Sequence, residues 1–316
     1  MSSNEEIIPI IDFSLFNTDP AQCAEHIKRA SESIGFFYLV NHGIPQQEID
    51  SMFELSKEFF NLSEDEKRRY LIGPNNIGYS AMFQERLDPG TQKKGDHKEA
   101  WNFGKFINGV AASELPAVFQ NRVEDVARFS KLGHNLCNQI LQSFAIGLQI
   151  PESEGSKDWF VSRNVYDKPS GDILRFLKYP KGDEQTHGEF VRAGSHTDYG
   201  SLTLLFQHQT PGLEVQASRT HWISAPLVPG AILVNIGDLM EFWTAGLFKS
   251  TRHRVVFLPE HATTDRYSIA MFCHANDAVP LEVVPSPVLA GRERTGKVIT
   301  AGEHLTSRLT ETYTYY

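Results

Sequence analysis

The amino-acid sequence predicts a mainly β protein with α-helices, in which a mixed, helix-rich N-terminal part rests on a closed double sheet of the jelly-roll or barrel type. After about residue 170, short apolar segments bounded by turn residues follow one another at the spacing typical of such sheets. Before them, apolar residues recur at steps of three and four from Asn121 to Leu148, which predicts one long helix that backs the sheet. The predicted C-terminal strands span residues 173–179, 192–196, 201–207, 213–216, 221–224, 231–235, 253–258 and 267–273.

The first 120 residues alternate between strand-like and helix-like segments. Apolar periodicity and turn residues predict strands within 7–13, 36–40 and 98–104, and helices at 21–33 and after Pro45. The run Ser63-Glu64-Asp65-Glu66 has the residue order of a capping box, which predicts a further short helix, and the Gly, Pro and Asn content of residues 73–95 predicts a loop. We therefore expect a mixed α/β region at 1–120, and the long helix with the jelly-roll domain at 121–316. No repeat or low-complexity linker separates them, so we expect one compact unit.

The composition argues against several classes of partner. The 316 residues carry a formal net charge of −9 without a run of Lys or Arg, which argues against nucleic acid and anionic membrane surfaces. Three widely spaced cysteines argue against a disulfide framework or a zinc ribbon and favour a reducing, cytoplasmic location. The N-terminus lacks the pattern of a secretory signal, and no apolar stretch reaches the ~20 residues of a membrane span. The expected partner is a small molecule.

A candidate metal site lies at the turn between two predicted strands, where His196 and Asp198 are two residues apart. Side chains at i and i+2 of an extended chain leave the same face, so an imidazole and a carboxylate can bind one ion together. His253 opens a later apolar strand and is the candidate third ligand. Two imidazoles and one carboxylate leave one side of the ion open, as expected for non-haem Fe(II) that also binds a co-substrate and O2. The competing interpretation is that the two histidines lie at the rim of the barrel without a metal.

A candidate anion site follows downstream. Arg266 and Ser268 are again two residues apart on a predicted strand. A guanidinium binds a carboxylate in bidentate fashion, so a dicarboxylate such as 2-oxoglutarate could chelate the iron at one end and contact Arg266 and Ser268 at the other. A surface ion pair of Arg266 with Asp265 or Glu260 is the alternative.

The order of these motifs resembles that of the isopenicillin N synthase-like Fe(II)/2-oxoglutarate-dependent dioxygenases, and the resemblance covers nearly the whole chain. It rests on His196-x-Asp198, His253 and Arg266-x-Ser268, and on segments 8–13, 35–44, 98–99, 235–238 and 253–255. The family often has Asn-Tyr-Tyr-Pro ahead of the metal motif, whereas this chain has Leu177-Lys178-Tyr179-Pro180. Tyr179 therefore carries over as a contact to 2-oxoglutarate, and the contact of the Asn is absent at Leu177.

The resemblance implies a distorted double-stranded β-helix, a jelly roll, with the metal in its mouth. It implies Fe(II), 2-oxoglutarate and O2 as cofactor and co-substrates, release of succinate and CO2, and hydroxylation of a small organic molecule. The segments 191–200 and 78–80 look most like those of microbial and fungal members, including nucleobase hydroxylases.

Aromatic residues are the candidates for the substrate pocket, with plain core packing as the alternative for each of them. The candidates are Tyr79, Trp101, Phe103 and Phe272, with Trp243 as a further one. Two other function classes stay open: an Fe(II) oxidase of the same fold that does not use 2-oxoglutarate, and a non-enzymatic binding module. The primary substrate, the choice among hydroxylation, desaturation and ring closure, and the oligomeric state are not specified by the sequence.

Overall fold

The computed structural model describes residues 7–88, 90–182, 191–261, 263–292 and 297–312. Its α-helices are α1 (Leu15–Thr18), α2 (Pro20–Ser33), α3 (Gln46–Phe60), α4 (Glu64–Arg68), α5 (Ala117–Gln120), α6 (Val123–Gly147), α8 (Asp238–Trp243) and α9 (Ala301–Thr312). Its strands are β1 (Ile10–Asp12), β2 (Phe36–Val40), β3 (Gly78–Ser80), β4 (Glu99–Phe103), β5 (Ile173–Tyr179), β6 (Ala193–His196), β7 (Leu202–His208), β8 (Leu213–Gln216), β9 (Trp222–Ser224), β10 (Ile232–Ile236), β11 (His253–Val255) and β12 (Arg266–Cys273).

Two sheets form the centre of the molecule. The larger sheet has eight strands in the order β1-β2-β10-β7-β12-β5-β4-β3, and the smaller has four in the order β6-β11-β8-β9. The N-terminal part contributes both edges of the larger sheet, with β1 and β2 at one edge and β4 and β3 at the other. The mainly β fold with helices is therefore confirmed, and the N-terminal strands extend the sheet of the C-terminal part.

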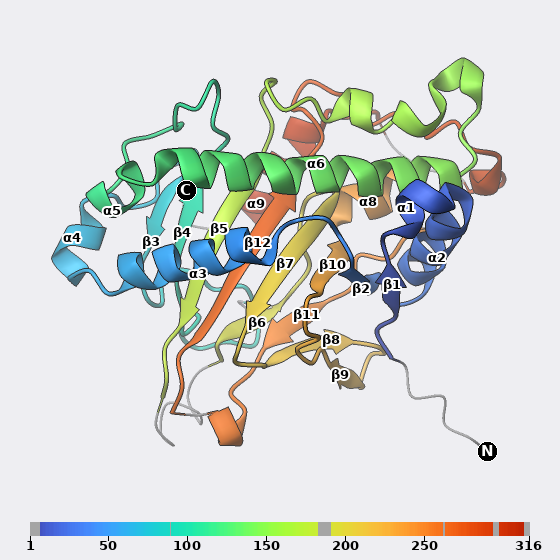
Figure 1. Cartoon of the computed structure of the whole chain (residues 1–316). Coiled ribbons are helices and arrows are strands. Elements are labelled where there is room, and N and C mark those ends of the chain that lie inside the picture. Colours follow the sequence, from blue (N-terminus) through green and yellow to red (C-terminus); the bar gives the residue numbers. More distant parts are fainter. Residues whose placement is uncertain (1–6, 89, 183–190, 262, 293–296, 313–316) are drawn as a thin grey trace.

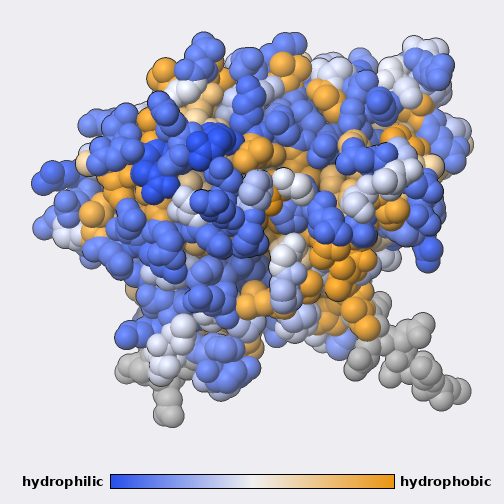
Figure 2. Space-filling model, in the orientation of Figure 1, coloured by the Kyte–Doolittle hydropathy of each residue, from blue (hydrophilic) through white to orange (hydrophobic). Residues whose placement is uncertain are grey.

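Helix α6 lies across one face of the larger sheet, with α3 beside it (Figure 1). The apolar residues at helical spacing form its buried stripe, which packs on β7 and β12. The long backing helix predicted at 121–148 is confirmed at Val123–Gly147. Over this face, Figure 2 shows mostly hydrophilic side chains, with a patch of apolar ones in the region of β1, where Ile10 is exposed.

Strand alternation separates the two faces of the larger sheet. In β7, Leu202, Leu204 and Phe206 belong to the core beneath the helices, whereas Thr203 and Leu205 face the smaller sheet. The alternation of side chains along the strand, with a period of two residues, predicts this division into an apolar and a mixed face. The face toward the smaller sheet is therefore the one that can carry a site.

Two local features differ from or refine the expected elements. Residues 73–95 were expected to be a loop, but they contain the three-residue strand β3, which pairs with β4 at the sheet edge. The capping box is confirmed: the Ser63 side chain accepts from the Glu66 amide, and the Glu66 side chain accepts from the Ser63 amide. Within the described part of the chain, no helix is both long and apolar enough to cross a membrane.

Candidate active site

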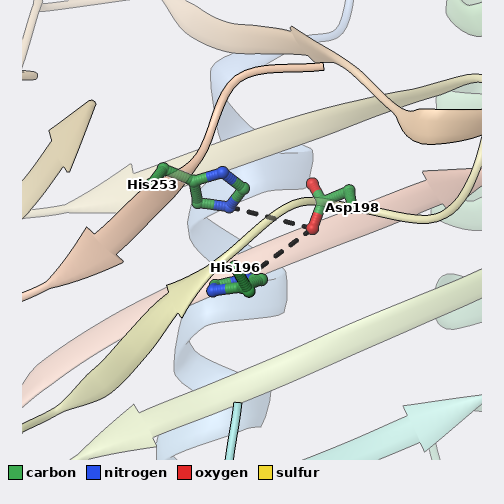
Figure 3. Close-up of side chains that lie close together, drawn as sticks. All are labelled: His196, Asp198 and His253. Carbon is green, nitrogen blue, oxygen red and sulfur yellow. Dashed lines mark ion pairs between the residues drawn. The ribbon is translucent and has the colours of Figure 1, made fainter. Parts of the chain in front are cut away.

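The three candidate metal ligands converge at the end of the smaller sheet (Figure 3). His196 ends β6 and His253 begins β11, and the two residues are paired directly across these antiparallel strands, with ring centroids 4.3 Å apart. The Nε2 atoms of both imidazoles lie 3.8 Å from Oδ1 of Asp198. Two strands and the turn that follows one of them therefore bring together residues that are far apart in the sequence.

Asp198 reaches this position from a turn rather than from a strand. Strand β6 ends at His196, so the same-face rule for an extended chain does not by itself place Asp198. The amide of Asp238 donates to the Asp198 carbonyl over 2.7 Å, which fastens the turn to the start of α8. The three side chains converge as expected, and the hydrogen bond from the start of α8 helps to hold Asp198 in place.

Hydrogen bonds outside the triad orient its ligand atoms. Nδ1 of His196 lies 2.8 Å from the Gly194 carbonyl, and Nδ1 of His253 lies 3.2 Å from the Thr251 carbonyl. Because a carbonyl only accepts, Nδ1 of each ring must carry the proton, and Nε2 of the neutral ring then presents a lone pair toward Asp198. Outer contacts of this kind fix the ring orientation of metal-binding histidines.

The Asp198 carboxylate is oriented in the same way. Its Oδ2 atom accepts from Thr203 Oγ1 over 2.6 Å and from Asn235 Nδ2 over 2.8 Å. Its Oδ1 atom therefore remains directed at the two imidazoles. Thr203 and Asn235 lie on neighbouring strands of the larger sheet, so this sheet sets the angle of the carboxylate.

Electrostatics at the triad favour a bound cation. Burial, with the neighbouring His253 imidazole, lowers the pKa of His196 to about 3, so this ring is neutral at physiological pH. Burial alone would raise the pKa of Asp198, but the two imidazoles and the hydrogen bonds from Thr203 and Asn235 outweigh it and lower that pKa. The Nε2 atoms of the two imidazoles and Oδ1 of the carboxylate face one another. This donor set, without thiolate, fits Fe(II).

Arg266 lies in the same space on β12 and is 1% exposed. Its guanidinium lies over the Tyr179 ring at 4.9 Å and also interacts with the Tyr179 hydroxyl, and its Nη atoms make long contacts of 3.4 Å with Ser268 Oγ and Gln207 Oε1. Its Nε atom has no hydrogen-bond partner, and no carboxylate of the described residues pairs with it. A buried cation of this kind requires an anion. A surface ion pair with Asp265 or Glu260 is excluded by this burial.

One cavity of about 570 Å³ between the two sheets contains both groups. The three metal-site side chains, Arg266, Ser268 and Tyr179 all line it. Leu177, Leu205, Leu213 and Val255 add apolar side chains to the lining of this cavity. An elongated dicarboxylate can therefore contact the metal site and the guanidinium from one cavity.

Only one of the predicted pocket aromatics is among the described residues that line this cavity, namely Phe272. Tyr79, Trp101 and Phe103 lie instead in an aromatic cluster beneath the helices, with Phe59 and Phe119. The pairing of β4 with β5 explains this: Ala100 is opposite Leu177 and shares its face, so the residues that alternate with Ala100 face away. Trp243 packs against Trp159 and Phe160 and does not line the cavity either.

A buried group of four charged residues borders the cavity and was not predicted. Lys98 lies 2.8 Å from Asp96 and 3.1 Å from Glu85, and Glu85 also pairs with Arg175. Lys98 and Arg175 both line the cavity. The sequence analysis singles out Lys98 only as part of a family-like segment. The i, i+2 spacing of Asp96 and Lys98 could have indicated one of these pairs, but no sequence neighbour indicates the pairs with Glu85.

Two sequence families match the chain. One is described as the non-haem dioxygenase in morphine synthesis N-terminal family and matches residues 8–121, and the other is the 2OG-Fe(II) oxygenase superfamily and matches residues 159–275. A UPF0676 protein of Schizosaccharomyces pombe is 35% identical over 98% of this chain and 93% of its own length. A probable iron/ascorbate oxidoreductase of Dictyostelium discoideum is 30% identical over 88% of this chain and 84% of its own length.

The chain belongs to the 2OG-Fe(II) oxygenase superfamily. The oxygenase is also similar to solved structures. A full-length Neurospora crassa protein in complex with alpha-KG and 5-formyluracil is 31% identical, with a TM-score of 0.83 over 99% of this chain and 98% of that chain. A putative 2OG-Fe(II) oxygenase family protein of Caulobacter crescentus is 28% identical, with a TM-score of 0.81 over 96% and 98% of the two chains.

Family membership establishes the class of this oxygenase. It is a non-haem iron enzyme that uses Fe(II), 2-oxoglutarate and O2, and its jelly-roll fold is that of its structural neighbours. The predicted resemblance, the fold and the cofactors are confirmed, and the non-enzymatic binding module is set aside.

Proposed function

We propose that this enzyme hydroxylates a small organic molecule, with His196, Asp198 and His253 as the Fe(II) ligands. In this proposal Arg266, Ser268 and Tyr179 bind the distal carboxylate of 2-oxoglutarate. The observation that carries it is the buried Arg266 guanidinium, which lacks a carboxylate partner among the described residues and shares one cavity with the metal triad. A carboxylate between them would satisfy both the cation and the open side of the metal site.

The roles of the residues follow from their contacts. Bound Fe(II) would supply O2 activation coupled to oxidative decarboxylation of 2-oxoglutarate, which yields succinate and CO2. Arg266 fixes the orientation of the co-substrate, because a guanidinium holds a carboxylate in a defined plane. Leu177, Leu213 and Val255 line the cavity around it and exclude water from the reacting centre.

The cavity supports a neutral, flat substrate. Lys98 and Arg175, the cations beside the metal site, are already balanced by Asp96 and Glu85, so no excess charge remains there for an anionic substrate. Phe272 on β12 offers an aromatic ring in the same wall. The similar Neurospora crassa protein has been solved with thymine and with 5-formyluracil. We therefore propose a pyrimidine-like heterocycle as the first class to screen.

A cytoplasmic location completes the proposal. All three cysteines, Cys23, Cys137 and Cys273, are free and buried, as expected in a reducing compartment. The division into an N-terminal region at 1–120 and a catalytic domain at 121–316 also stays a prediction.

Anaerobic titration tests the assigned roles. We expect Fe(II) and 2-oxoglutarate together to produce the visible charge-transfer band of the chelate in the wild-type protein. His253→Ala is expected to abolish the band by removing a ligand. Arg266→Gln is expected to retain Fe(II) binding but to raise the 2-oxoglutarate concentration needed for half of the band by at least about tenfold, because one charged hydrogen-bonding partner is lost.

Arg254→Gln is the matched control, because Arg254 on β11 of the smaller sheet does not line the cavity and pairs with Glu214 over 2.7 Å. It is expected to behave as wild type. Normal band formation by Arg266→Gln would remove the assigned carboxylate site, and an intact band in His253→Ala would remove the assigned ligand set. Consumption of O2 by the wild type without 2-oxoglutarate, once a substrate is found, would favour the oxidase instead.

A further inference from the structure

The C-terminal helix α9 forms part of the cavity wall. Leu305 and Leu309 of α9 line the cavity. The Leu305 side chain lies so close to Gly171 that a Cβ there would be 2.3 Å from Leu305 Cδ2. His304 of the same helix packs over the Phe242 ring of α8 at 5.6 Å. Helix α9 therefore covers one side of the cavity and is held there through α8, which adjoins it.

One carboxylate joins α9 to the turn that carries the metal ligands. Asp238 begins α8, and its Oδ2 atom pairs with Arg308 Nη2 of α9 over 2.8 Å. The same Oδ2 atom accepts from Thr197 Oγ1 over 3.0 Å, and Thr197 stands between His196 and Asp198. The backbone of Asp238 reinforces this link through its 2.7 Å bond to the Asp198 carbonyl.

The other carboxylate oxygen of Asp238 contacts the segment that leads to His253. Its Oδ1 atom accepts from Ser250 Oγ over 2.6 Å. Ser250 precedes Thr251, whose carbonyl accepts from Nδ1 of His253. A single side chain, 14% exposed, is therefore bonded to α9 and to both segments that supply metal ligands.

We propose that Asp238 is a positioning residue that couples the docking of helix α9 over the cavity to the geometry of the metal ligands. The proposal rests on the proposed function, because it assumes that His196, Asp198 and His253 hold Fe(II). Asp238 itself is not among the described residues whose side chains could share the ion. It acts by holding Thr197 and Ser250, and Arg308 holds Asp238 in turn. Docking of α9 therefore closes the cavity and orders the ligands at the same time.

A helix that only covers the cavity would respond differently to the loss of Arg308. If α9 only shields the cavity, loss of Arg308 should change substrate retention and leave Fe(II) binding unchanged. If Asp238 transmits the contact, loss of Arg308 should also weaken Fe(II) binding. The Fe(II)- and 2-oxoglutarate-dependent band distinguishes the two, because it is measured without substrate and without turnover.

The experiment is an anaerobic titration of Fe(II) into the full-length protein at saturating 2-oxoglutarate. Asp238→Asn is expected to weaken apparent Fe(II) affinity about 10-fold and to shift the band, as changes behind metal ligands do. Arg308→Gln is expected to weaken it about 3-fold. The double variant should be no weaker than Asp238→Asn alone, because Arg308 acts through Asp238. Arg128→Gln, which loses a surface arginine pair with Glu48 on the far side of the sheet, is the control and should match wild type.

Identical Fe(II) affinity and band in Arg308→Gln and Arg128→Gln would overturn the proposal, even if substrate turnover changed. If Asp238→Asn does not fold, Thr197→Val takes its place, and additive effects of Thr197→Val and Arg308→Gln would overturn it as well. A wild-type protein that forms no band would instead contradict the proposed function.

Discussion

At the scale of single residues, the site depends on contacts that the ligand motif does not contain. Thr203 and Asn235 both donate to Oδ2 of Asp198 and leave Oδ1 directed at His196 and His253. Both lie on strands of the larger sheet, while the ligands belong to the smaller sheet and its adjoining turn. The position of the carboxylate is thus a property of the sandwich rather than of the local sequence.

Thr203→Val tests this point, because valine keeps the shape of threonine and removes only the hydroxyl. We expect about 10-fold weaker Fe(II) binding, measured by the band of the chelate, since the carboxylate loses one of the two donors that orient it. Thr210→Val is the matched control: Thr210 is also buried, but its hydroxyl bonds to the Asp265 carbonyl and not to Asp198. Equal loss of Fe(II) affinity in both variants would count against a specific role for Thr203.

The convergence of the proposed ligands could be predicted from the sequence, because the residue types are specific and their order matches that of the family they resemble. His196, Asp198, His253 and Arg266 are found around one cavity, as expected. The outer contacts could not be predicted, because Thr203 reads as one more residue on the mixed face of a strand. The sequence shows that Thr203 lies on the mixed face of a strand, but it does not show that Asp198 lies within hydrogen-bond distance of it.

At the scale of secondary-structure elements, alternation along strands predicts which residues share a face but not which face carries the site. Every residue of β4 is buried, on one side under the helices and on the other beside the cavity. Burial therefore does not distinguish the two faces, and Trp101 and Phe103 lie beneath the helices instead of in the predicted substrate pocket. In β12 the faces differ, because Arg266 and Ser268 alternate with apolar Tyr267 and Ile269, and the assignment agreed with the structure.

The junction between β10 and α8 is the element whose shape most directly affects the metal site. Gly237 has φ −105° and ψ 170°, which any residue can adopt, but a Cβ there would lie 2.2 Å from the Gly200 carbonyl oxygen and 3.1 Å from that of Asp198. Gly237→Ala is therefore expected to displace the ligand turn, to lower the free energy of unfolding by about 2 kcal/mol and to weaken Fe(II) binding. Urea unfolding and Fe(II) titration measure the two effects.

Gly90→Ala is the control for that substitution. A Cβ at Gly90 would have its nearest neighbour at 3.7 Å, so no clash is expected. Wild-type Fe(II) affinity in Gly237→Ala would show that the turn can relax without moving Asp198.

At the scale of the whole molecule, the N-terminal part is built into the catalytic sheet at both of its edges. A buried ionic group adds a second connection, since Glu85, Asp96 and Lys98 come from the N-terminal part and Arg175 from β5. The predicted division near residue 120 describes the order of the chain, whereas the packing joins the two parts along shared strands.

The ionisation of Glu85 makes the stability of this buried ionic group depend on pH. Burial alone would raise the pKa of Glu85, but Arg175 and Lys98 lower it from 4.5 to about 2. Folding therefore favours the ionised carboxylate, so the stabilisation is fully present above about pH 4.5 and is lost as the pH falls through about 2. Glu85→Gln is expected to lower the free energy of unfolding by about 3 kcal/mol at pH 7.

The difference between wild type and Glu85→Gln should shrink as the pH falls below 4.5, because the carboxylate of the unfolded chain then takes up a proton, whereas the folded one stays ionised until about pH 2. Urea unfolding at a series of pH values from 7 to 3 measures this difference. Glu152→Gln removes an exposed carboxylate and should leave the free energy of unfolding near that of wild type throughout. A constant gap between wild type and Glu85→Gln across the series would mean that the variant acts through lost packing, and that the charge of Glu85 does not hold the N-terminal part to β5.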